Sequence, residues 1–361
     1  MLTGAPPSRL RSMRAVVYES FGQTPSVQDV ESPSAPAHGV VIAVEATGVC
    51  RSDWHAWAGH DDSVSVPHVP GHELVGRVAR AGEAVTRFTI GDRVTVPFVC
   101  GCGTCEFCRS GNAQVCPTQT QPGFTHWGSW ADEVVIHHAD TNLVTAPEDL
   151  PAEAVLPLGC RFATAFRGLH DRARLSAGEV VAVFGCGGVG LSAIMIAKAI
   201  GADVVAVDIS RDALELARTM GAGACVDSTG LTEAEVAAAV RDAAAGLGTD
   251  VGPHVTVEAL GLETTLNAAL QSLRPLGRHV QIGLLSGRPT TAVPQVIGQE
   301  LSLLGSHGMA AADYGPLVAL VVEGRLRPQD LVTRTISLEE APAAMEEMAR
   351  GSSTGLTIIR P

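Results

Sequence analysis

The sequence predicts an α/β protein of two domains, one of short irregular strands and one built on a doubly wound parallel sheet. Up to about residue 150, short Val- and Gly-rich runs alternate with prolines, which is typical of short β-strands. From about Pro151, apolar strands alternate with Ala-rich helical segments, which is typical of a parallel sheet covered on both faces. The length of 361 residues fits two domains of roughly 150 residues each.

Short strands separated by prolines are expected in the first domain. The first strand is predicted near Met13, and further strands over residues 39–46, 73–79 and 93–96, with breakers at Pro67, Pro70, Pro97 and Pro122. Proline cannot donate a ladder hydrogen bond, so it interrupts a sheet. Residues 1–12 contain proline and glycine and lack the apolar stretch of a secretory signal, so we expect a loose extension there.

Strands and helices are expected to alternate in the second domain. Strands are predicted over residues 180–184, 204–207, 224–226, 255–258, 278–283 and 301–304, and helices up to about residue 200 and over 211–220 and 233–245. An apolar run near the C-terminus, residues 355–360, is expected to return as a strand to the first domain. The predicted domains are therefore residues 13–160 together with 305–361, and residues 161–304.

Charge and composition exclude several classes of partner. The net charge is −13, and an acidic surface repels the phosphate backbone of nucleic acids. No apolar run reaches the roughly 18 residues of a membrane span, so no membrane partner is expected. Four of the nine cysteines lie so close together that a metal explains them better than disulfides do. A reducing cytoplasm is the expected compartment.

A glycine-rich loop directly follows the strand at residues 180–184. It runs Gly185-Cys186-Gly187-Gly188-Val189-Gly190 and opens a helix, as in a dinucleotide-binding strand–turn–helix unit. Gly185 permits the tight turn, Gly187 lets the backbone approach a pyrophosphate, and Gly190 allows close helix packing. Asp208, at the end of the next strand, is expected to bind the ribose hydroxyls of NAD and to repel the 2′-phosphate of NADP. Arg211 is close enough to weaken this preference.

A compact group of four cysteines is a strong metal signal. Cys102, Cys105, Cys108 and Cys116 have the spacing C-x2-C-x2-C-x7-C. Four such thiolates can surround one tetrahedral zinc ion and leave no position open, as structural zinc sites do. An iron–sulfur cluster is the alternative. The neighbouring Cys100 does not fit the spacing and is expected to be a free, buried thiol.

Three scattered segments offer a second set of metal ligands. The segment Cys50-Arg51-Ser52-Asp53-Trp54-His55 carries a thiol, a hydroxyl, a carboxylate and an imidazole, His72-Glu73 follows, and Cys160 comes much later. Two thiolates and one imidazole are three protein ligands, which leaves the fourth position of a tetrahedral zinc open for exchange.

With these motifs the chain resembles the zinc-containing alcohol dehydrogenases of the medium-chain dehydrogenase/reductase family, from about Met13 to the C-terminus. The run Gly71-His72-Glu73-Leu74-Val75-Gly76, followed by Gly82 and Val85, matches the zinc signature of that family. The four cysteines match its structural-zinc loop and residues 185–190 its coenzyme loop. The resemblance implies a GroES-like irregular β catalytic domain and a Rossmann doubly wound coenzyme domain. It also implies two zinc ions per chain, with Cys50, His72 and Cys160 as the ligands of the catalytic one.

Further roles near the catalytic zinc follow from the resemblance. Glu73 stands where the family has a carboxylate that can replace the zinc-bound water, and Asp53 would orient His72. Ser52 and His55 match a relay that carries the proton of the substrate hydroxyl to the surface.

The resemblance also assigns coenzyme contacts. Arg51 matches a cation near the pyrophosphate, and Thr164 and Val189 match residues that pack against the nicotinamide. Ala213 and Gly355 depart from a lysine and an arginine that some relatives have near the coenzyme.

These residues imply reversible hydride transfer between a primary or secondary alcohol and NAD, with zinc activating the oxygen of the alcohol, aldehyde or ketone. The alternatives are a zinc-dependent reductase of a conjugated double bond, a zinc-free quinone or enone reductase, and a non-catalytic NAD-binding protein. Ser52 and His55 count against the double-bond reductase, because such members often lack the relay. Candidate walls of an apolar substrate pocket are Trp54, Trp57, Phe124 and Trp127. The family forms dimers and tetramers, so a homodimer or homotetramer is expected.

Overall fold

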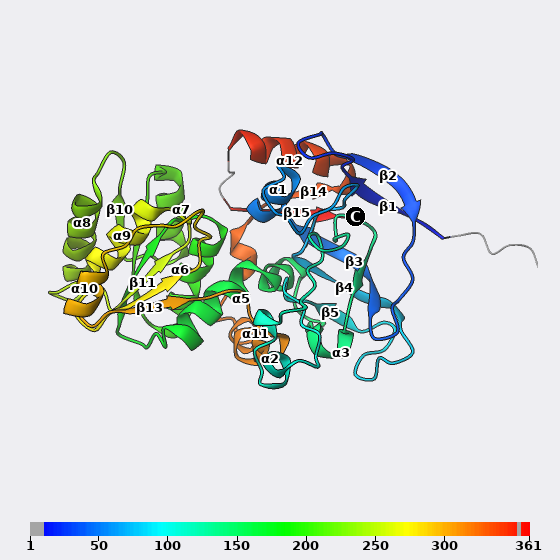
Figure 1. Ribbon diagram of the computed structural model, residues 1–361, viewed down its shortest axis with the longest axis horizontal. Coiled ribbons are helices and arrows are strands. Elements are labelled where there is room, and N and C mark those ends of the chain that lie inside the picture. Colours follow the sequence, from blue (N-terminus) through cyan, green and yellow to red (C-terminus); the bar gives the residue numbers. More distant parts are fainter. Residues whose placement is uncertain (1–10, 352–354) are drawn as a thin grey trace, which may run out of the picture.

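The computed structural model describes residues 11–351 and 355–361, which form two lobes (Figure 1). Residues 1–10 of the expected extension lie outside the described residues, and strand β1 already begins at Ser12. Within the described part of the chain, no helix has the length and apolar character needed to cross a membrane.

One lobe is built on six parallel strands in the order β10-β9-β8-β11-β12-β13. They are β8 (Val180–Phe184), β9 (Asp203–Asp208), β10 (Ala224–Asp227), β11 (Val255–Glu258), β12 (Arg278–Gln281) and β13 (Ser302–Gly305). The chain winds outward from β8 in both directions, and in such sheets ligands bind at the carboxyl ends of the strands. All six predicted strands are confirmed, although their ends shift by up to two residues.

Helices cover both faces of this sheet. Val181 and Val183 of β8 belong to the core that includes α6 (Gly188–Ile200). The alternate side chains of β8, those of Val180, Ala182 and Phe184, belong to the core that includes α8 (Glu233–Ala245) and α9 (Glu263–Ser272). Burial on both faces explains why β8 is a continuous apolar run.

The other lobe holds a seven-stranded sheet along the path β14-β15-β3-β4-β5-β7, with β6 paired to β3. The strands are β3 (Val40–Gly48), β4 (Leu74–Ala81), β5 (Arg93–Thr95), β6 (Glu133–Ile136), β7 (Val144–Thr145), β14 (Val332–Ser337) and β15 (Leu356–Arg360). A separate antiparallel pair consists of β1 (Ser12–Val17) and β2 (Ser26–Glu31). The C-terminal strand β15 pairs with β3, so it does return to this lobe, as expected.

The remaining helices are mostly short. They are α1 (Arg51–Trp57), α2 (Glu106–Arg109), α3 (Ala139–Asn142), α4 (Ala152–Val155), α5 (Arg161–Phe166), α7 (Arg211–Met220), α10 (Val293–Gly298), α11 (Tyr314–Val322) and α12 (Ala341–Arg350). A π-helical segment, Arg167–Arg172, continues α5. Five 3-10 turns complete the described elements: Ala113–Val115, Leu156–Gly159, Ala311–Asp313, Pro328–Leu331 and Leu338–Glu340.

Several elements were not predicted from the sequence. Strands β2, β6 and β14 have mixed burial patterns rather than a continuous apolar run. Helix α9 contains Thr, Asn and Gln beside its buried leucines, and α10 has a proline in its first turn. The helices predicted over residues 211–220 and 233–245 are confirmed as α7 and α8.

The glycine loop before α6 leaves no room for a side chain at Gly190. A Cβ atom there would lie 1.7 Å from the carbonyl oxygen of Gly185, whereas a Cβ at Gly187 would have no atom within 4 Å. Overpacking costs about 1–3 kcal/mol, so we expect Gly190→Ala to lower the free energy of unfolding by that amount. Gly305→Ala at the end of β13, where a Cβ would also have no atom within 4 Å, is the control and should not lower it. Thermal unfolding checks both variants, and equal midpoints would contradict this packing role of Gly190.

Candidate active site

Three predicted ligand residues from distant parts of the chain meet at one place. Cys50 is the N-cap residue of α1, His72 lies just before β4, and Cys160 precedes α5. One ligand atom from each lies within 4.8 Å of the other two. His72 and Cys160 are buried and Cys50 is half-buried, so the cluster is open on one side. We call these residues the three-ligand cluster.

Asp53 orients the imidazole of His72. The Nδ1 atom lies 2.9 Å from Oδ1 of Asp53, and this carboxylate also accepts hydrogen bonds from the backbone N–H groups of Gly71 and Cys50. Because a carboxylate only accepts, Nδ1 carries a proton, which leaves Nε2 as the ring nitrogen available to a metal ion. That Nε2 atom is buried and has no hydrogen-bond partner in the described structure. A buried, unpartnered imidazole nitrogen beside two thiols fits a zinc ion, which would replace any proton on Nε2.

The acid–base properties of the cluster also call for a cation. A hydrogen bond between the two thiols lowers the pKa of Cys50 well below its ordinary value and raises that of Cys160. Burial alone would lower the pKa of His72, but the charge of Asp53 and the Cys50 sulfur outweigh it and raise that pKa. Without a metal, therefore, the second thiol holds its proton. A bound divalent cation lets both thiols ionise together.

Glu73 follows His72 directly, and Arg161 holds its carboxylate. The arginine Nε lies 2.8 Å from Oε1, Nη2 lies 2.5 Å from Oε2, and the backbone N–H of Arg161 also donates to Oε1. Both side chains are at most 5 % exposed. Glu73 is not part of the cluster of atoms within 4.8 Å of one another. The carboxylate that the sequence suggested as a further zinc ligand is thus held by an arginine in this structure.

The four clustered cysteines form a separate group in the loop around α2. The sulfur atoms of Cys102, Cys105, Cys108 and Cys116 all lie within 4.8 Å of one another. Hydrogen bonds from the hydroxyl and the N–H of Thr104 lower the pKa of Cys102 to about 5, whereas burial raises that of Cys108 to about 12. Four thiolates this close repel one another, so a cation is needed for all four to ionise. The donor set fits a tetrahedral zinc with no open position.

The glycine-rich loop joins the carboxyl end of β8 to the first turn of α6. Gly185 has a φ of 92°, a conformation that glycine reaches at little cost. Gly187 has open space where a side chain would stand. The first turn of an α-helix has N–H groups without helical partners, so a phosphate fits at this end.

Asp208 ends β9 beside this loop. One carboxylate oxygen accepts a hydrogen bond from the N–H of Cys186 in the loop, at 2.7 Å, and the other accepts from Ser210 at 2.9 Å. Arg211 has a side chain that is 90 % exposed, and its Nε lies 3.4 Å from Asp227. The structure thus brings the loop and the predicted ribose-binding acid together, with Arg211 at the rim.

The two relay candidates lie on α1. The Ser52 hydroxyl lies 3.8 Å from the sulfur of Cys50. His55, almost one turn later, is exposed, and its Nδ1 lies 3.1 Å from Nδ1 of His60. Burial of part of the ring, the charge of Arg51 and the neighbouring His60 lower the pKa of His55. The helix therefore carries a hydroxyl beside the cluster and an imidazole at the surface.

The other predicted coenzyme residues occupy different surroundings. The guanidinium of Arg51 lies 3.9 Å from the ring centre of Trp54 and donates to the carbonyl of Met348 in α12. Thr164 is buried in α5, and Val189 is half-buried in the first turn of α6. Arg51 is thus anchored to its own lobe in this structure.

One of the four aromatic residues expected to line the pocket lies against the three-ligand cluster. The ring centre of Phe124 is 5.2 Å from that of His72. The indole nitrogens of Trp57 and Trp127 donate to backbone carbonyls elsewhere in the same lobe, and Trp54 packs under an arginine. Of these four residues, Phe124 is therefore the one whose ring contacts the cluster within the described residues.

All nine cysteines are free thiols in the structure. Cys100, which did not fit the zinc spacing, is 1 % exposed and donates to the carbonyl of Pro97. Burial raises its pKa to about 12. Cys100 is therefore the free, buried thiol that the sequence predicted.

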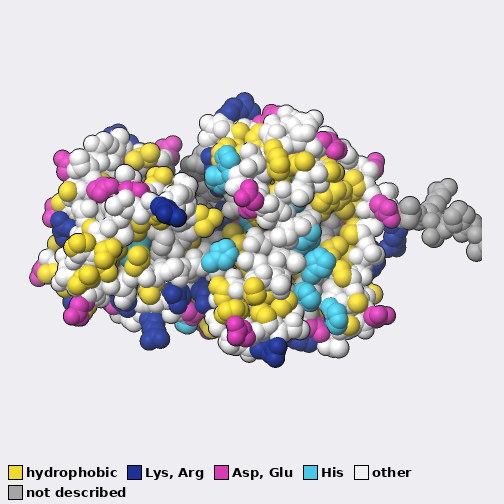
Figure 2. Space-filling model, viewed as in Figure 1, with side chains coloured by type: hydrophobic (Ala, Val, Ile, Leu, Met, Phe, Trp, Pro, Cys, Tyr) yellow, Lys and Arg dark blue, Asp and Glu magenta, His cyan; other side chains and the backbone are white. Residues whose placement is uncertain are grey.

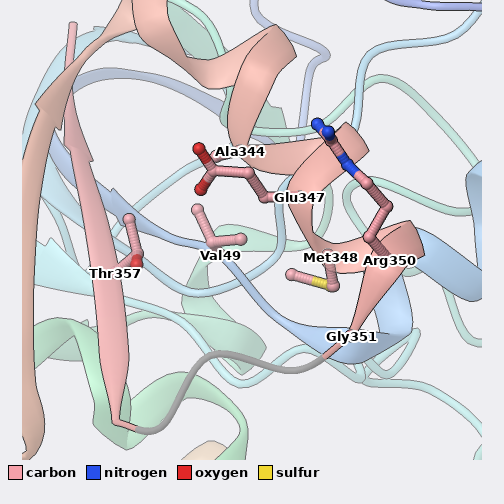
Figure 3. A pocket seen from close by; sticks show the side chains of 7 residues that line it. All are labelled: Val49, Ala344, Glu347, Met348, Arg350, Gly351 and Thr357. Carbon is pink, nitrogen blue, oxygen red and sulfur yellow. The ribbon is translucent and has the colours of Figure 1, made fainter.

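Two cavities adjoin these residues. One of about 240 Å³ lies between α12, with Glu347, Met348 and Arg350, and the side formed by Val49 and Thr357 (Figure 3). The other, of about 520 Å³, lies between the cysteine loop and the carboxyl ends of β12 and β13. Its polar lining consists mainly of Asn112, Gln114, Arg167, Arg172, Gln281 and His307. This second cavity opens at the edge of the sheet where ligands of such folds bind.

Sequence reasoning missed two residues of the site, Arg161 and His60. Arg161 is a lone charge within the apolar segment at residues 156–166, and such a charge needs a buried partner. That signal could have identified it. The sequence contains no comparable signal for His60, because its contact with His55 depends on the turn after α1.

Comparisons with known proteins agree with this geometry. Residues 36–148 match the alcohol dehydrogenase GroES-like domain, and residues 188–323 match the zinc-binding dehydrogenase domain. An alcohol dehydrogenase of Geobacillus stearothermophilus is 31% identical over 352 residues, covering 96% of this chain and 99% of the relative. A sorbitol dehydrogenase of Halalkalibacterium halodurans is 30% identical, covering 94% of this chain and 97% of the relative.

A solved structure shows the same architecture over both lobes. The alcohol dehydrogenase TADH from Thermus sp. ATN1 superposes with a TM-score of 0.87 at 31% identity, covering 96% of this chain and 99% of that one. The predicted fold class, a GroES-like domain with a Rossmann-type domain, is confirmed. The chain therefore belongs to the zinc-binding alcohol dehydrogenases of the medium-chain dehydrogenase/reductase family.

Proposed function

We propose that this protein catalyses reversible hydride transfer between a primary or secondary alcohol and NAD, with an aldehyde or ketone as the product. The observation that carries the proposal is the unpartnered Nε2 of His72 beside two thiols, in a chain that also has a dinucleotide loop. A zinc-free reductase needs no such ligand set, and a non-catalytic NAD-binding protein needs no open metal position.

We infer that two zinc ions bind per chain in different roles. The four-cysteine group supplies four ligands and so closes a tetrahedral shell, which gives a structural site. The three-ligand cluster supplies three and leaves one position for substrate. When bound, zinc supplies Lewis-acid polarisation of the substrate oxygen, and the nicotinamide accepts or returns the hydride.

The chain's own residues provide the proton path. The hydroxyl of Ser52, beside the Cys50 sulfur, is placed to accept the proton of a substrate hydroxyl held at the cluster. His55, almost one turn later on the same helix, is placed at the surface to exchange a proton with solvent, and its lowered pKa keeps the imidazole neutral and able to accept a proton at neutral pH. A reductase of a conjugated double bond has less use for this relay, which favours the alcohol as substrate.

NAD is the proposed coenzyme rather than NADP. The two backbone hydrogen bonds to Asp208 hold its carboxylate beside the glycine loop, where it can accept from ribose hydroxyls. A 2′-phosphate at that position would be repelled by the carboxylate. Arg211 offers little compensation, because its nearest charged partner is Asp227.

The cavity at the carboxyl ends of β12 and β13 is the proposed path for the substrate. The ring of His307 in the cavity wall lies 5.4 Å from that of Phe98, which lies 6.2 Å from that of His72, so aromatic rings lead from the cavity toward the cluster. Phe124 adds an apolar ring beside His72, whereas Arg167 and Arg172 make the cavity itself partly polar. Apolar alcohols and polyols therefore differ in which part of the site they use. A panel of aliphatic, benzylic and polyol substrates distinguishes the two, and a strong polyol preference would contradict an apolar pocket.

We infer that the domains are residues 13–160 with 305–361, and residues 161–304. The pairing of β15 with β3 supports this division, because it places the C-terminal strand in the sheet of the first lobe.

We infer that the protein works in a reducing compartment such as the cytoplasm. All nine cysteines are free thiols, and six of them belong to the two potential zinc sites.

A homodimer formed through the edge strand β13 is the proposed assembly, with a homotetramer as the alternative. Strand β13 ends the six-stranded sheet, and an edge strand offers unpaired backbone groups to a second chain. Leu284, Ile297 and Leu303 near this edge are 86 %, 72 % and 47 % exposed. Figure 2 shows hydrophobic side chains over the part of this lobe that carries α10. A twofold axis would bury this apolar surface of one chain against the same surface of the second chain.

Substitutions of Cys50 and Ser52 distinguish metal binding from proton transfer. We expect Cys50→Ala to lose one zinc per chain and to lower turnover by at least about 1000-fold, because the substrate oxygen is no longer polarised. Ser52→Ala should keep the metal and NAD affinity but lower turnover by about 100- to 10,000-fold. Metal analysis and steady-state kinetics check both variants.

Cys100→Ala is the matched control, since it removes another buried thiol without touching a ligand cluster. It should retain both the metal content and the turnover. Unchanged zinc in Cys50→Ala would disprove the catalytic-zinc assignment, and normal turnover in Ser52→Ala would disprove the relay.

Asp208→Ser tests coenzyme choice. Hydrogen bonds to a charged group are worth about 1.5–3 kcal/mol, so NAD affinity should fall by about 10- to 100-fold. The affinity for NADP should rise relative to the affinity for NAD, because the carboxylate that repels the 2′-phosphate is absent. Asp203→Ser, at the exposed start of the same strand, is the control and should change neither affinity. Fluorescence titration with both reduced coenzymes provides the measurement, and an unchanged ratio would exclude Asp208 as the selector.

Ile297→Glu tests the proposed dimer. A charge at this apolar patch should shift the solution mass toward a single chain, because burying it across the interface is costly. The control is Ile90→Glu, which changes an isoleucine of 71 % exposure in the other lobe. Light scattering measures the mass of both variants. If Ile297→Glu assembles like the unchanged protein, the interface lies elsewhere.

A further inference from the structure

We propose that Arg161 links the metal site to the coenzyme site: two of its nitrogens hold Glu73, and the third, Nη1, binds a phosphate oxygen of the coenzyme. The inference rests on the proposed function, because it takes a dinucleotide as the ligand of the glycine loop. Arg161 would then be a positioning residue for Glu73 and a binding residue for NAD.

Arg161 is a buried cation with one nitrogen left over. Its side chain is 5 % exposed. Nε and Nη2 bind the carboxylate of Glu73, and Nη2 also donates to the carbonyl of Val49. No acceptor for Nη1 lies among residues 11–351 and 355–361. Nη1 is not among the buried atoms that lack a partner, so this unused donor can be reached by a ligand, and a charged donor binds an anion strongly.

The unused nitrogen lies at the glycine loop. A Cβ atom built on Gly188 would stand 2.8 Å from Nη1 of Arg161 and 3.3 Å from its Cζ. Gly188 is the first residue of α6, a helix of 13 residues. The neighbouring Gly187 has nothing within 4 Å of its Cβ position. The guanidinium therefore lies against the first residue of α6, next to the open side of Gly187, and a guanidinium and a helix N-terminus both favour an anion.

Charge keeps Arg161 available for this role. An arginine guanidinium keeps its charge in proteins, and the two hydrogen bonds to the Glu73 carboxylate stabilise that charge here. The guanidinium is therefore charged whether or not the coenzyme is bound. A phosphate on Nη1 and the carboxylate of Glu73 then share one cation.

Sharing makes the two sites interdependent. A phosphate bound to Arg161 weakens the attraction between the guanidinium and the Glu73 carboxylate. By linkage, a weaker contact with Glu73 raises the affinity of Arg161 for the phosphate. Removing the charge of Glu73 should therefore leave coenzyme affinity equal to that of the unchanged protein or higher. Removing Arg161 as well should abolish the gain and lower the affinity.

Titration of zinc-loaded protein with NADH, followed by fluorescence, tests the link without using turnover. The decisive pair is Glu73→Gln and the double variant Glu73→Gln/Arg161→Gln, because neither substitution set leaves a buried carboxylate unpaired. We expect NADH to bind the double variant at least about tenfold more weakly than Glu73→Gln. Zinc content and the thermal midpoint, measured on the same samples, show that both variants are folded and loaded.

A matched pair in the first lobe is the control. Arg93 is 6 % exposed, and its Nε lies 3.0 Å from Glu45. The variants Glu45→Gln and Glu45→Gln/Arg93→Gln remove a comparable arginine–carboxylate contact far from the glycine loop in the chain. They should bind NADH with the same affinity as each other.

The outcomes separate this inference from the proposed function. Equal NADH affinity of Glu73→Gln and the double variant, at equal zinc content, would overturn the role of Arg161 while the alcohol dehydrogenase activity stands. Weaker binding by Glu73→Gln than by the unchanged protein would also overturn it, because the two sites would then not compete for one cation. If the unchanged protein, loaded with zinc, does not bind NADH, both proposals are wrong.

Discussion

Two buried carboxylates, those of Asp53 and Glu73, must be neutralised inside the protein, and the groups that do so hold the active site together. Both side chains have no exposed surface, and an unpaired buried charge costs several kcal/mol. Asp53 draws the N-cap of α1 and the segment before β4 onto one carboxylate. Glu73 draws the start of α5 onto the same segment through Arg161. The three metal-ligand residues cannot separate without exposing these charges to an apolar surrounding.

The two metal clusters are assembled in different ways. The four cysteines lie within one short loop, and hydrogen bonds from neighbouring N–H groups to the sulfurs organise it locally. The three-ligand cluster depends on long-range packing, since 110 positions separate Cys50 from Cys160. A local site forms with few constraints on the rest of the chain, whereas a dispersed site exists only when the distant segments of the first lobe have packed together. This difference suits a closed structural ion and an exchangeable catalytic one.

The coenzyme lobe was predictable because its elements carry strong local patterns. Burial on both faces makes β8 apolar throughout and β9 apolar between its terminal aspartates, and capping residues such as Ser210 and Thr232 begin the helices α7 and α8. The first lobe was harder to predict, because its strands are short and half-exposed. Strands such as β2 and β14 owe their conformation to pairing with distant segments, and their own residues show little preference.

The sequence by itself determined the parts of the site that depend on spacing along the chain. The four cysteines, the glycine loop and the acid at Asp208 are set by distances of a few to about 20 residues, over which backbone geometry is regular. Only the tertiary structure decided which buried groups neutralise each other. The contact of Arg161 with Glu73 joins residues 88 positions apart, and its free nitrogen at Gly188 depends on how α5 packs beside α6. Desolvation and packing in three dimensions determine such contacts. The sequence alone does not give the spatial distance between residues that lie far apart along the chain.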